Sequence, residues 1–270
     1  MGKFLIIGGS GVMGTAAIQA VRKVHGKNAF IIASWFGKEE PNYQIPGANC
    51  TIYGDITQDS CLDEIKSVKG DDFEFLFYAT AMGEVGFPIK DSTAEQIAHS
   101  NRLSFDPLPN LETTFQVKTI VTYSTFYLLK HQVCSYGAMA HSKEKIEKWI
   151  VEKETKSQRV CIRAGLFESH SSRAIKLLLR KNARAINKES NPLLDSYFNG
   201  VPASQGIKKF ESGICQEETD TYGDSGTTID SLKEAHLTIL KDNSIKFANV
   251  CGKKIWLSDL PLFLENNIRV

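Results

Sequence analysis

Residues 4–14 read Phe-Leu-Ile-Ile-Gly-Gly-Ser-Gly-Val-Met-Gly, an apolar run that ends in glycines. Such a run is typical of a strand that a parallel sheet buries on both faces. Gly9, Gly11 and Gly14 fit the spacing G-x-G-x-x-G; counted from Gly8, the cluster also fits G-x-x-G-x-x-G. Glycines so spaced allow a tight turn, close approach of the backbone to a pyrophosphate, and close helix–strand packing. A helical pattern follows, whose N-terminus favours phosphate. We predict a dinucleotide site; the alternative is the same strand, turn and helix without a phosphate ligand.

Strand-like and helix-like segments alternate through the first part of the chain. The expected strands are 3–7, 29–34, 50–53, 73–79, 117–123 and 159–163, and the expected helices are 11–25, 58–69, 91–103 and 136–154. This alternation predicts βαβ units with right-handed crossovers. The predicted fold class is therefore α/β, a doubly wound parallel sheet of the Rossmann type in three α/β/α layers. Ligands bind such sheets at the carboxyl ends of the strands.

The pattern loosens after residue 165. Residues 171–188 and 227–242 have helical patterns, residues 190–226 read as irregular, and Ile255 to Leu264 is expected to hold an edge strand. No linker is visible. We predict one NAD(P)-binding domain, 1–270, in which 166–250 form a C-terminal region that faces the substrate, because loops on a rigid sheet commonly carry specificity.

Composition excludes several classes of protein. The net charge is +1 and 42% of the 270 residues are hydrophobic, so no general attraction to nucleic acid or membrane is expected. No apolar run reaches the roughly 18–20 residues of a membrane span, and no signal-peptide pattern is present. Six cysteines are scattered without a C-x-x-C motif, which favours reduced thiols, no metal site and a cytoplasmic location.

The end of the second expected strand bears on the choice of nicotinamide cofactor. It reads Ile32-Ala33-Ser34-Trp35-Phe36-Gly37-Lys38 and has no acid at its tip. An acid there binds the ribose 2′-hydroxyl of NAD, whereas a basic or small polar neighbourhood admits the 2′-phosphate of NADP. We predict that Ser34 and Lys38 contact this phosphate, that Trp35 stacks on adenine, and that NADP(H) is favoured over NAD(H). The alternative is that Lys38 is a solvated loop lysine.

Ser124, Tyr136 and Lys143 are the candidate catalytic residues. A strand is expected to end near Ser124, and one helix is expected to carry Tyr136 and Lys143, seven residues apart and so on one face. The lysine charge would lower the pKa of the tyrosine, and the serine would hold the substrate oxygen. Together they would supply a proton as hydride arrives from nicotinamide. The alternative is a tyrosine that packs its ring and shows its hydroxyl to water.

These stretches, taken in order, resemble the short-chain dehydrogenase/reductase superfamily over about the first 165 residues. The matching segments are Gly8 to Gly14, Gly54-Asp55-Ile56, Ala79-Thr80-Ala81, then Ser124, Tyr136 and Lys143, and finally Arg163-Ala164-Gly165. The resemblance implies an adenine contact at Asp55, a cofactor wall at 79–81, and a nicotinamide contact in 163–167. The implied cofactor-binding residues are Gly8, Gly9, Ser10, Gly11, Val12, Met13, Gly14, Ser34, Trp35, Lys38, Asp55, Ile56, Ala79, Thr80, Ala81, Lys143, Ala164, Gly165 and Leu166.

The chain departs from the usual pattern of this superfamily, which is tyrosine, three residues, lysine; position 140 is alanine here. Tyrosine, six residues, lysine, with Met139 between, resembles the enoyl-acyl-carrier-protein reductase branch. There the tyrosine helps to stabilise an enolate while hydride reduces a C=C bond. The glycine motif and residues 163–165 resemble instead the extended and atypical branches. Asn101 matches the helix asparagine of the superfamily, although Pro107 and Pro109 are expected to break that helix.

The function that the resemblance implies is NADP(H)-dependent hydride transfer to a C=O or C=C bond of a small or acyl-carrier-linked substrate. Two alternatives stay open: an NADP-binding sensor without turnover, and a nucleotide-sugar-type epimerase or dehydratase. The segment 171–188 is rich in cations and has no acid. It is either a solvated face or a basic lip for an acyl-carrier protein or coenzyme A. A homo-oligomer is also left open.

Overall fold

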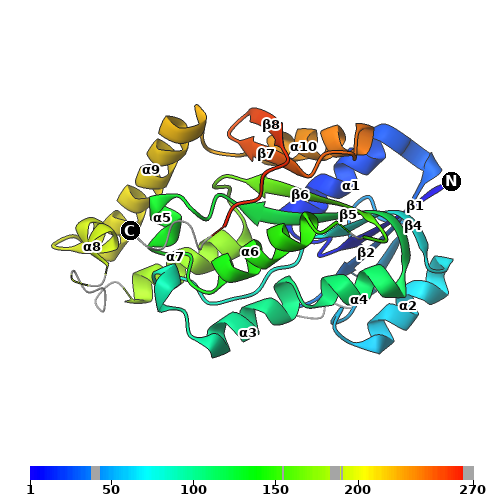
Figure 1. Ribbon diagram of the computed structural model, residues 1–270, viewed down its shortest axis with the longest axis horizontal. Coiled ribbons are helices and arrows are strands. Elements are labelled where there is room, and N and C mark those ends of the chain that lie inside the picture. Colours follow the sequence, from blue (N-terminus) through cyan, green and yellow to red (C-terminus); the bar gives the residue numbers. More distant parts are fainter. Residues whose placement is uncertain (38–42, 154, 183–188, 190, 264–270) are drawn as a thin grey trace.

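One mixed sheet organises the molecule (Figure 1). The computed structural model describes residues 1–37, 43–153, 155–182, 189 and 191–263. Within them the strands lie in the order β3-β2-β1-β4-β5-β6-β7-β8. Their bounds are β1 Gly2–Ile7, β2 Ala29–Trp35, β3 Cys50–Tyr53, β4 Asp72–Tyr78, β5 Gln116–Thr125, β6 Gln158–Ala164, β7 Phe247–Cys251 and β8 Lys254–Ser258. All neighbours pair in parallel except β7 and β8. The strand order reverses between β1 and β4, where a crevice opens at the carboxyl ends.

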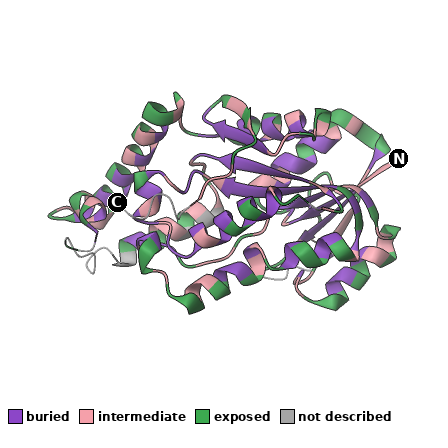
Figure 2. Ribbon diagram, viewed as in Figure 1, coloured by how far each residue is buried: buried purple, intermediate pink, exposed green. Residues whose placement is uncertain are grey.

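Helices cover both faces of the sheet and confirm the three-layer Rossmann prediction. On one face lie α1 (Val12–His25) and α10 (Ile229–Lys241), which pack on inward side chains of β1, β2, β5 and β6. On the other face lie α2 (Asp59–Lys69), α4 (Pro107–Thr114) and α6 (Met139–Ile150), with α3 (Ala94–Ser104) against α6. The strands between these layers are the most buried part of the molecule (Figure 2). Burial on both faces explains why β1 reads as a continuous apolar run.

The first six strands fall where the sequence predicts them, to within a residue or two. The predicted helix 91–103 corresponds to α3, which ends at Ser104 before Pro107. Pro107 then occupies the first turn of α4, where a missing N–H costs nothing. The prolines therefore separate two helices, as expected.

The prediction of irregular structure over 190–226 is wrong. This segment holds α8 (Pro192–Phe198) and α9 (Ala203–Tyr222). The buried residues of α9 include Ile207, Phe210 and Ile214, which recur at helical spacing among polar neighbours. The expected edge strand is β8, which is shorter than Ile255 to Leu264, and its antiparallel partner β7 was not predicted.

A group of helices between residues 130 and 222 gathers beyond the carboxyl ends of the strands, at the opposite end of the molecule from the N-terminus (Figure 1). They are α7 (His170–Asn182), α8 and α9, with the short α5 (Lys130–Val133) beside α9. Their apolar side chains form a cluster of their own, separate from the two clusters that flank the sheet. Among the described residues, no helix has the length and apolar character needed to cross a membrane.

Candidate functional site

The glycine loop is held against the sheet by its own backbone. The N–H groups of Gly8 and Gly9 both donate to the carbonyl of Ser34, at 3.0 and 2.8 Å, and Gly11 N–H donates to Gly8 O at 3.0 Å. Gly8 has a φ of +81°, in the left-handed region that favours glycine. The loop therefore ties the end of β1 to the end of β2 and places the N-terminus of α1 over the crevice.

The glycines of this loop differ in what a side chain would meet. A Cβ on Gly8 would lie 2.7 Å from the carbonyl oxygen of Ala79, and one on Gly9 would lie 2.9 Å from the Ala33 side chain. A Cβ on Gly14 would collide with the backbone of Gly8. At Gly11 the nearest atom would be 3.4 Å away, an ordinary contact, with a φ of −80° that any residue adopts. The protein fold needs the other glycines, whereas the bare backbone at Gly11 leaves space that a ligand can use.

The start of α1 fits a phosphate group. The first bond within the helix runs from Thr15 N–H to Gly11 O, at 2.8 Å, so Val12, Met13 and Gly14 precede it and have no helical acceptor. No acid lies in the first turn. Gly11, Val12 and Met13 all line the space above the loop. Free N–H groups, a positive dipole end and the open Gly11 cradle together suit a pyrophosphate.

A first cavity, which we call the loop cavity, lies over the ends of β1, β2 and β4. Its lining residues are Ile7, Gly8, Ser10, Gly11, Ser34, Trp35, Phe36, Gly54, Ile56, Ala79, Thr80, Ala81 and Leu103. No acid stands among these described residues. Trp35 packs edge-on against Tyr43 and Tyr53, with ring centroids 5.0 Å from each. Lys38 lies outside the described residues.

Asp55 is placed differently from its neighbours Gly54 and Ile56, which line the loop cavity. Its Oδ1 accepts from the backbone N–H of Thr57 at 3.0 Å and from the Thr57 hydroxyl at 2.8 Å. Its Oδ2 lies 3.7 Å from Arg102. One carboxylate oxygen thus stabilises the turn into α2, and the adenine contact implied by the resemblance stays a prediction.

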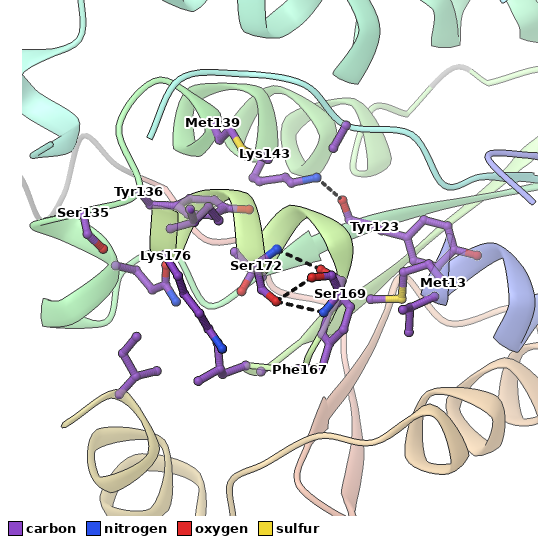
Figure 3. Close-up of a pocket in the computed structure, with 18 of the residues that line it drawn as sticks. Met13, Tyr123, Ser135, Tyr136, Met139, Lys143, Phe167, Ser169, Ser172 and Lys176 are labelled. Atoms are coloured by element: carbon purple, nitrogen blue, oxygen red, sulfur yellow. Dashed lines mark hydrogen bonds between the residues drawn. The ribbon is translucent and has the colours of Figure 1, made fainter. Parts of the chain in front are cut away.

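A second cavity, the central cavity, continues from the loop cavity through Gly11 and residues 79–81, which line both. The strands contribute Tyr123, Ser124 and Thr125, and the turn after β6 contributes Gly165, Leu166 and Phe167 (Figure 3). The other walls come from α5, α6, α7 and α9. Of the predicted site residues, Ser124, Tyr136, Lys143, Gly165 and Leu166 therefore face one space. Gly9, Gly14, Asp55 and Ala164 line neither cavity.

Lys143 lies on α6, and its side chain is buried. Its ammonium Nζ donates to the carbonyl of Tyr123 at 3.0 Å (Figure 3). Burial lowers the pKa of Lys143 to about 8, because a desolvated ammonium is disfavoured. Met139, four residues earlier and so one turn away on the same helix face, also lines the central cavity.

The prediction that one helix carries Tyr136 and Lys143 is wrong. The helix α6 begins at Met139, and Tyr136 lies in the turn before it, bridged to Phe87. Gly137, with a φ of +49°, separates the two. The predicted lowering of the tyrosine pKa by lysine is also wrong, because burial raises the pKa of Tyr136. The Tyr136 hydroxyl lies in the central cavity and makes no hydrogen bond to a described residue (Figure 3).

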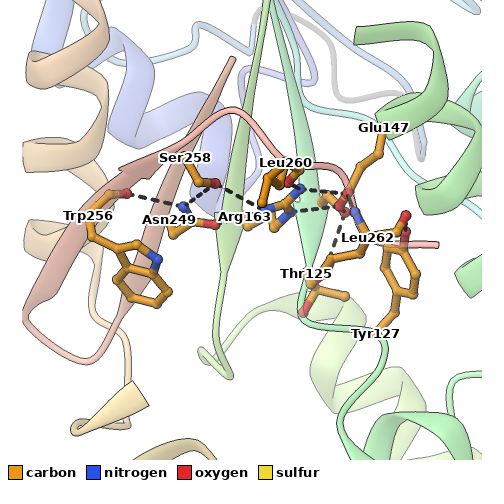
Figure 4. A network of polar contacts seen from close by, with 10 residues as sticks. Thr125, Tyr127, Glu147, Arg163, Asn249, Trp256, Ser258, Leu260 and Leu262 are labelled. Carbon is orange, nitrogen blue, oxygen red and sulfur yellow. Dashed lines mark hydrogen bonds and ion pairs between the residues drawn. The ribbon is translucent and has the colours of Figure 1, made fainter. Parts of the chain in front are cut away.

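Ser124 lies at the end of β5, as predicted, but its hydroxyl has an internal partner. It donates to Glu147 Oε1 at 2.7 Å. Glu147 is fully buried and forms a two-pronged ion pair with Arg163, at 2.8 and 2.7 Å (Figure 4). It also accepts from the backbone N–H of Leu262, so the chain beyond β8 is fastened to α6. The Ser124 proton is therefore engaged, and a substrate oxygen would have to compete with a carboxylate for it.

Two further residues of the sequence analysis are engaged inside the protein. The side-chain oxygen of Asn101 accepts from the Ser142 hydroxyl at 2.9 Å, and Asn101 is buried. Ala164 gives its carbonyl to the hydroxyl of Thr125, also at 2.9 Å. These contacts join α3 to α6 and β5 to β6 and leave neither group free to reach a ligand without rearrangement.

The sequence patterns predicted a substrate-facing region over 166–250, but they revealed neither the individual wall residues of α9 nor the Glu147–Arg163 pair. Ile207, Phe210, Glu211 and Ile214 line the cavity from α9. Their spacing of three and four residues was the available signal, hidden by the polar residues between them. Glu147 carried a signal too, because it stands four residues after Lys143 and so shares its helix face.

Two cations of the basic segment 171–188, Arg173 and Lys176, are paired with acids, whereas Arg180 is exposed and makes no ion pair with a described residue. Lys176 lies 2.5 Å from Glu211 Oε1 and 3.2 Å from Glu168 Oε1, and Arg173 lies 3.7 Å from Glu168. Arg184 and Lys188 lie outside the described residues. The segment is therefore less of a free cationic surface than the sequence suggests, because acids from neighbouring segments pair with it.

Solved structures share this fold at low sequence identity. A short-chain dehydrogenase family protein from Francisella tularensis subsp. tularensis SCHU S4 matches with a TM-score of 0.61 and 17% identity, over 93% of this chain and 98% of that one. An NAD⁺-bound xylitol dehydrogenase matches with a TM-score of 0.64 and 13% identity, over 93% and 98%. A small-chain dehydrogenase in complex with NADPH matches with a TM-score of 0.54 and 12% identity, over 93% and 97%. No protein-family model and no curated protein matches. The chain thus has the fold of the short-chain dehydrogenases/reductases, as its resemblance implied.

Proposed function

We propose that the protein is an NADP(H)-dependent oxidoreductase of the short-chain dehydrogenase/reductase type that reduces a C=O or C=C bond of a small or carrier-linked substrate. The observation that carries the proposal is the open cradle at Gly11. It lies where two cavities meet, one running past Trp35 and the other to Lys143 and Tyr136. Space for a pyrophosphate therefore stands between space for an adenine and space for a reacting group.

The cofactor, when bound, would supply the hydride. The chain's own residues would do the rest. The loop N–H groups and the start of α1 would hold the phosphates, with Ser34 and Trp35 at the ribose and adenine. The Lys143 ammonium would bind ribose hydroxyls from the floor of the central cavity. Residues of 166–250, from α7 and α9, would enclose the substrate and exclude water.

Tyr136 is the hydroxyl best placed to meet the substrate oxygen. The other hydroxyls of the strand ends are already engaged. Ser124 donates to Glu147 and Thr125 to Ala164, and Tyr123 is hydrogen-bonded to Nε2 of His236, whose Nδ1 faces the Leu232 carbonyl. Ser135 donates to His131 O, Ser172 to Ser169 O and Thr80 to Leu103 O, and the Ser169 hydroxyl oxygen accepts from the Ser172 N–H. A tyrosine whose pKa is raised by burial is a weak acid but keeps its proton for hydrogen bonding. This favours stabilising an enolate oxygen, and so a C=C bond next to a carbonyl group, over direct protonation of an alkoxide.

The second candidate is an NADP-binding sensor without turnover. One observation favours it. The usual superfamily spacing, tyrosine, three residues, lysine, counted back from Lys143, falls on Met139, whose thioether gives no proton. If Tyr136 does not act from its place before α6, the site binds cofactor but lacks its acid.

Two measurements with purified protein separate these functions. NADPH binding is followed by cofactor fluorescence, and NADPH oxidation is followed with a panel of enones and ketones. Binding with steady oxidation by any member supports the oxidoreductase. Binding without oxidation by any member supports the sensor, and no binding contradicts both.

The compartment is part of the same proposal. All six cysteines are free thiols, four of them buried. Free thiols persist in a reducing environment, which supports a cytoplasmic enzyme with access to NADPH.

A further inference from the structure

The central cavity continues past Tyr136 into a chamber between α7 and α9. Its walls there are apolar: Ile175 and Leu179 come from α7, and Ile207, Phe210 and Ile214 come from α9. These side chains belong to the apolar cluster that α7, α8 and α9 share. A ligand that reaches the chamber therefore meets the interior of a hydrophobic cluster rather than a polar loop.

Charge is scarce on this wall. Among the described residues that line the central cavity, the cations are Lys143 and Lys176 and the acid is Glu211. Lys143 donates to the Tyr123 carbonyl beneath the proposed cofactor site. Lys176 and Glu211 neutralise each other across the chamber, with 2.5 Å between Nζ and Oε1 and side chains only 25% and 29% exposed. Among the described residues, no unpaired charge is therefore left on the walls between α7 and α9 to hold an anionic group.

We propose that the chamber takes an uncharged substrate with an extended apolar tail, and that Glu211 is the specificity-determining residue that keeps carboxylate and phosphate groups out. This inference rests on the proposed function, since the chamber adjoins the proposed reaction site. An anion that sought Lys176 would have to displace Glu211, leaving a partly buried carboxylate without its cation. That cost falls on charged ligands alone, because a neutral apolar chain leaves the pair intact.

A matched control exists on the same lysine. Glu168 also pairs with Lys176, at 3.2 Å, but its side chain is 71% exposed and lines neither cavity. Loss of Glu168 leaves the inner partner in place, and an exposed ion pair contributes little. Glu211→Gln and Glu168→Gln therefore each remove one carboxylate partner of Lys176. Glu211 lines the chamber, whereas Glu168 lies outside it.

The first experiment measures binding without turnover. The neutral probe N-phenyl-1-naphthylamine, which fluoresces in apolar sites, is bound to the protein and displaced by decanol or by decanoate at neutral pH. We expect decanol to displace it from the wild type at concentrations about tenfold lower than decanoate. In Glu211→Gln, the affinity for decanoate should rise by about tenfold, or about 1.4 kcal/mol, while the affinity for decanol stays unchanged. Glu168→Gln should resemble the wild type, and Glu211→Gln with Lys176→Met should lose the gain.

The same titration tests where decanol binds and which outcomes contradict the proposal. Ile207→Ala should weaken the binding of decanol severalfold. Leu177→Ala, on the exposed side of α7, should leave that binding unchanged. Wild-type protein that binds decanoate as tightly as decanol overturns the proposal. So does a Glu211→Gln variant that folds, by its melting curve, and gains nothing for decanoate, and so does the absence of probe binding.

The second experiment uses turnover and keeps the two proposals apart. NADPH oxidation is compared for a long-chain enone and for the same enone with a terminal carboxylate. Two results together support both proposals: the wild type oxidises NADPH faster with the neutral enone, and the difference between the two enones is smaller in Glu211→Gln. No oxidation of either enone or of any member of the panel above, with the displacement pattern intact, contradicts the oxidoreductase and leaves the chamber specificity standing.

Discussion

The two ends of the crevice are built in different ways. At the loop cavity the proposed phosphate site is one contiguous segment, residues 8–14, and backbone hydrogen bonds from Gly8 and Gly9 to Ser34 hold it against the sheet. At the substrate end the walls are side chains from α5, α6, α7 and α9, segments that packing brings together. The shape of the loop depends on glycines that have no Cβ atom, whereas the shape of the substrate end depends on which side chains pack together. Changes at the two ends should therefore fail in different ways.

The largest effect is expected at the loop. Gly11→Val should abolish measurable NADPH binding, because its side chain enters the cradle, while the melting temperature stays close to that of the wild type. Gly14→Ala should instead lower the melting temperature, because its Cβ meets the Gly8 backbone. Overpacking of this kind costs roughly 1–3 kcal/mol of unfolding free energy. Fluorescence titration and thermal melts of both variants test this. A Gly11→Val protein that binds NADPH normally would refute the cofactor site.

This contrast also explains what sequence could predict. The loop, its strand and its helix are fixed by neighbours in the chain, so spacing alone found them. The start of α6 is not. Gly137 N–H donates to Phe87 O and Ala138 N–H to Glu84 O, each at 3.1 Å, and these distant contacts hold Tyr136 in a turn. The helical periodicity of residues 136–154 does not reveal these contacts. It therefore predicts that Tyr136 and Lys143 share a helix face, which the structure does not show.

The same reasoning covers the second half of the chain. In α9 the apolar residues recur at helical spacing, but Gly206, Gly213 and many polar residues lie between them. Intrinsic propensity was therefore weak, and packing against α5, α7 and α8 decides the structure. Ser124 was found by its position at a strand end, but its partner Glu147 comes from another element and could not be paired from sequence alone.

At the substrate end, Tyr136→Phe should leave NADPH binding unchanged and lower kcat. The substitution removes one hydroxyl and keeps the ring packing; loss of a positioned acid or hydrogen-bond donor costs roughly 10²–10⁴-fold in rate. Ser124→Ala is the control, and we expect a smaller loss because the Ser124 proton already goes to Glu147. Stopped-flow or steady-state oxidation of NADPH with an active enone measures both. A Ser124→Ala defect larger than that of Tyr136→Phe would exchange their roles.

Lys143 stands between the two ends, and its effect should depend on pH. With a pKa of about 8 in the folded protein, it is charged below that pH and neutral above it. NADPH affinity should therefore weaken, by about tenfold if one charged hydrogen bond worth about 1.5 kcal/mol is lost, as the pH rises through about 8. Lys143→Ala should bind weakly at every pH, with kcat reduced as well.

Loss of fold is not expected to mimic this pH effect. The unfolded lysine holds its proton up to its ordinary value of 10.5, so between about 8 and 10.5 the unfolded state binds more protons through this group. The contribution of Lys143 to stability thus rises with pH in the window where binding weakens. Titrations at several pH values, with melting curves at each, separate the two. Affinity that is flat through this range would show that the Lys143 charge does not contact the cofactor.

The smallest effect concerns the far edge of the loop cavity. We expect NADPH to bind about tenfold more tightly than NADH, a difference of about 1.4 kcal/mol. The physical reason is the lining: Ser34 and Trp35 end β2 and Phe36 follows them, and no acid stands among the described residues of this cavity to bind a ribose 2′-hydroxyl or repel a 2′-phosphate. Trp35→Asp should reverse the preference, because a carboxylate at the strand end accepts from the hydroxyl and repels the phosphate. Parallel fluorescence titrations with the two cofactors measure the ratio, and Val24→Asp, which adds the same charge at an exposed residue of α1 that lines neither cavity, is the control. Tighter binding of NADH by the wild type would mean that the 2′ position is read by residues other than these, and the sequence interpretation of the strand end would be wrong.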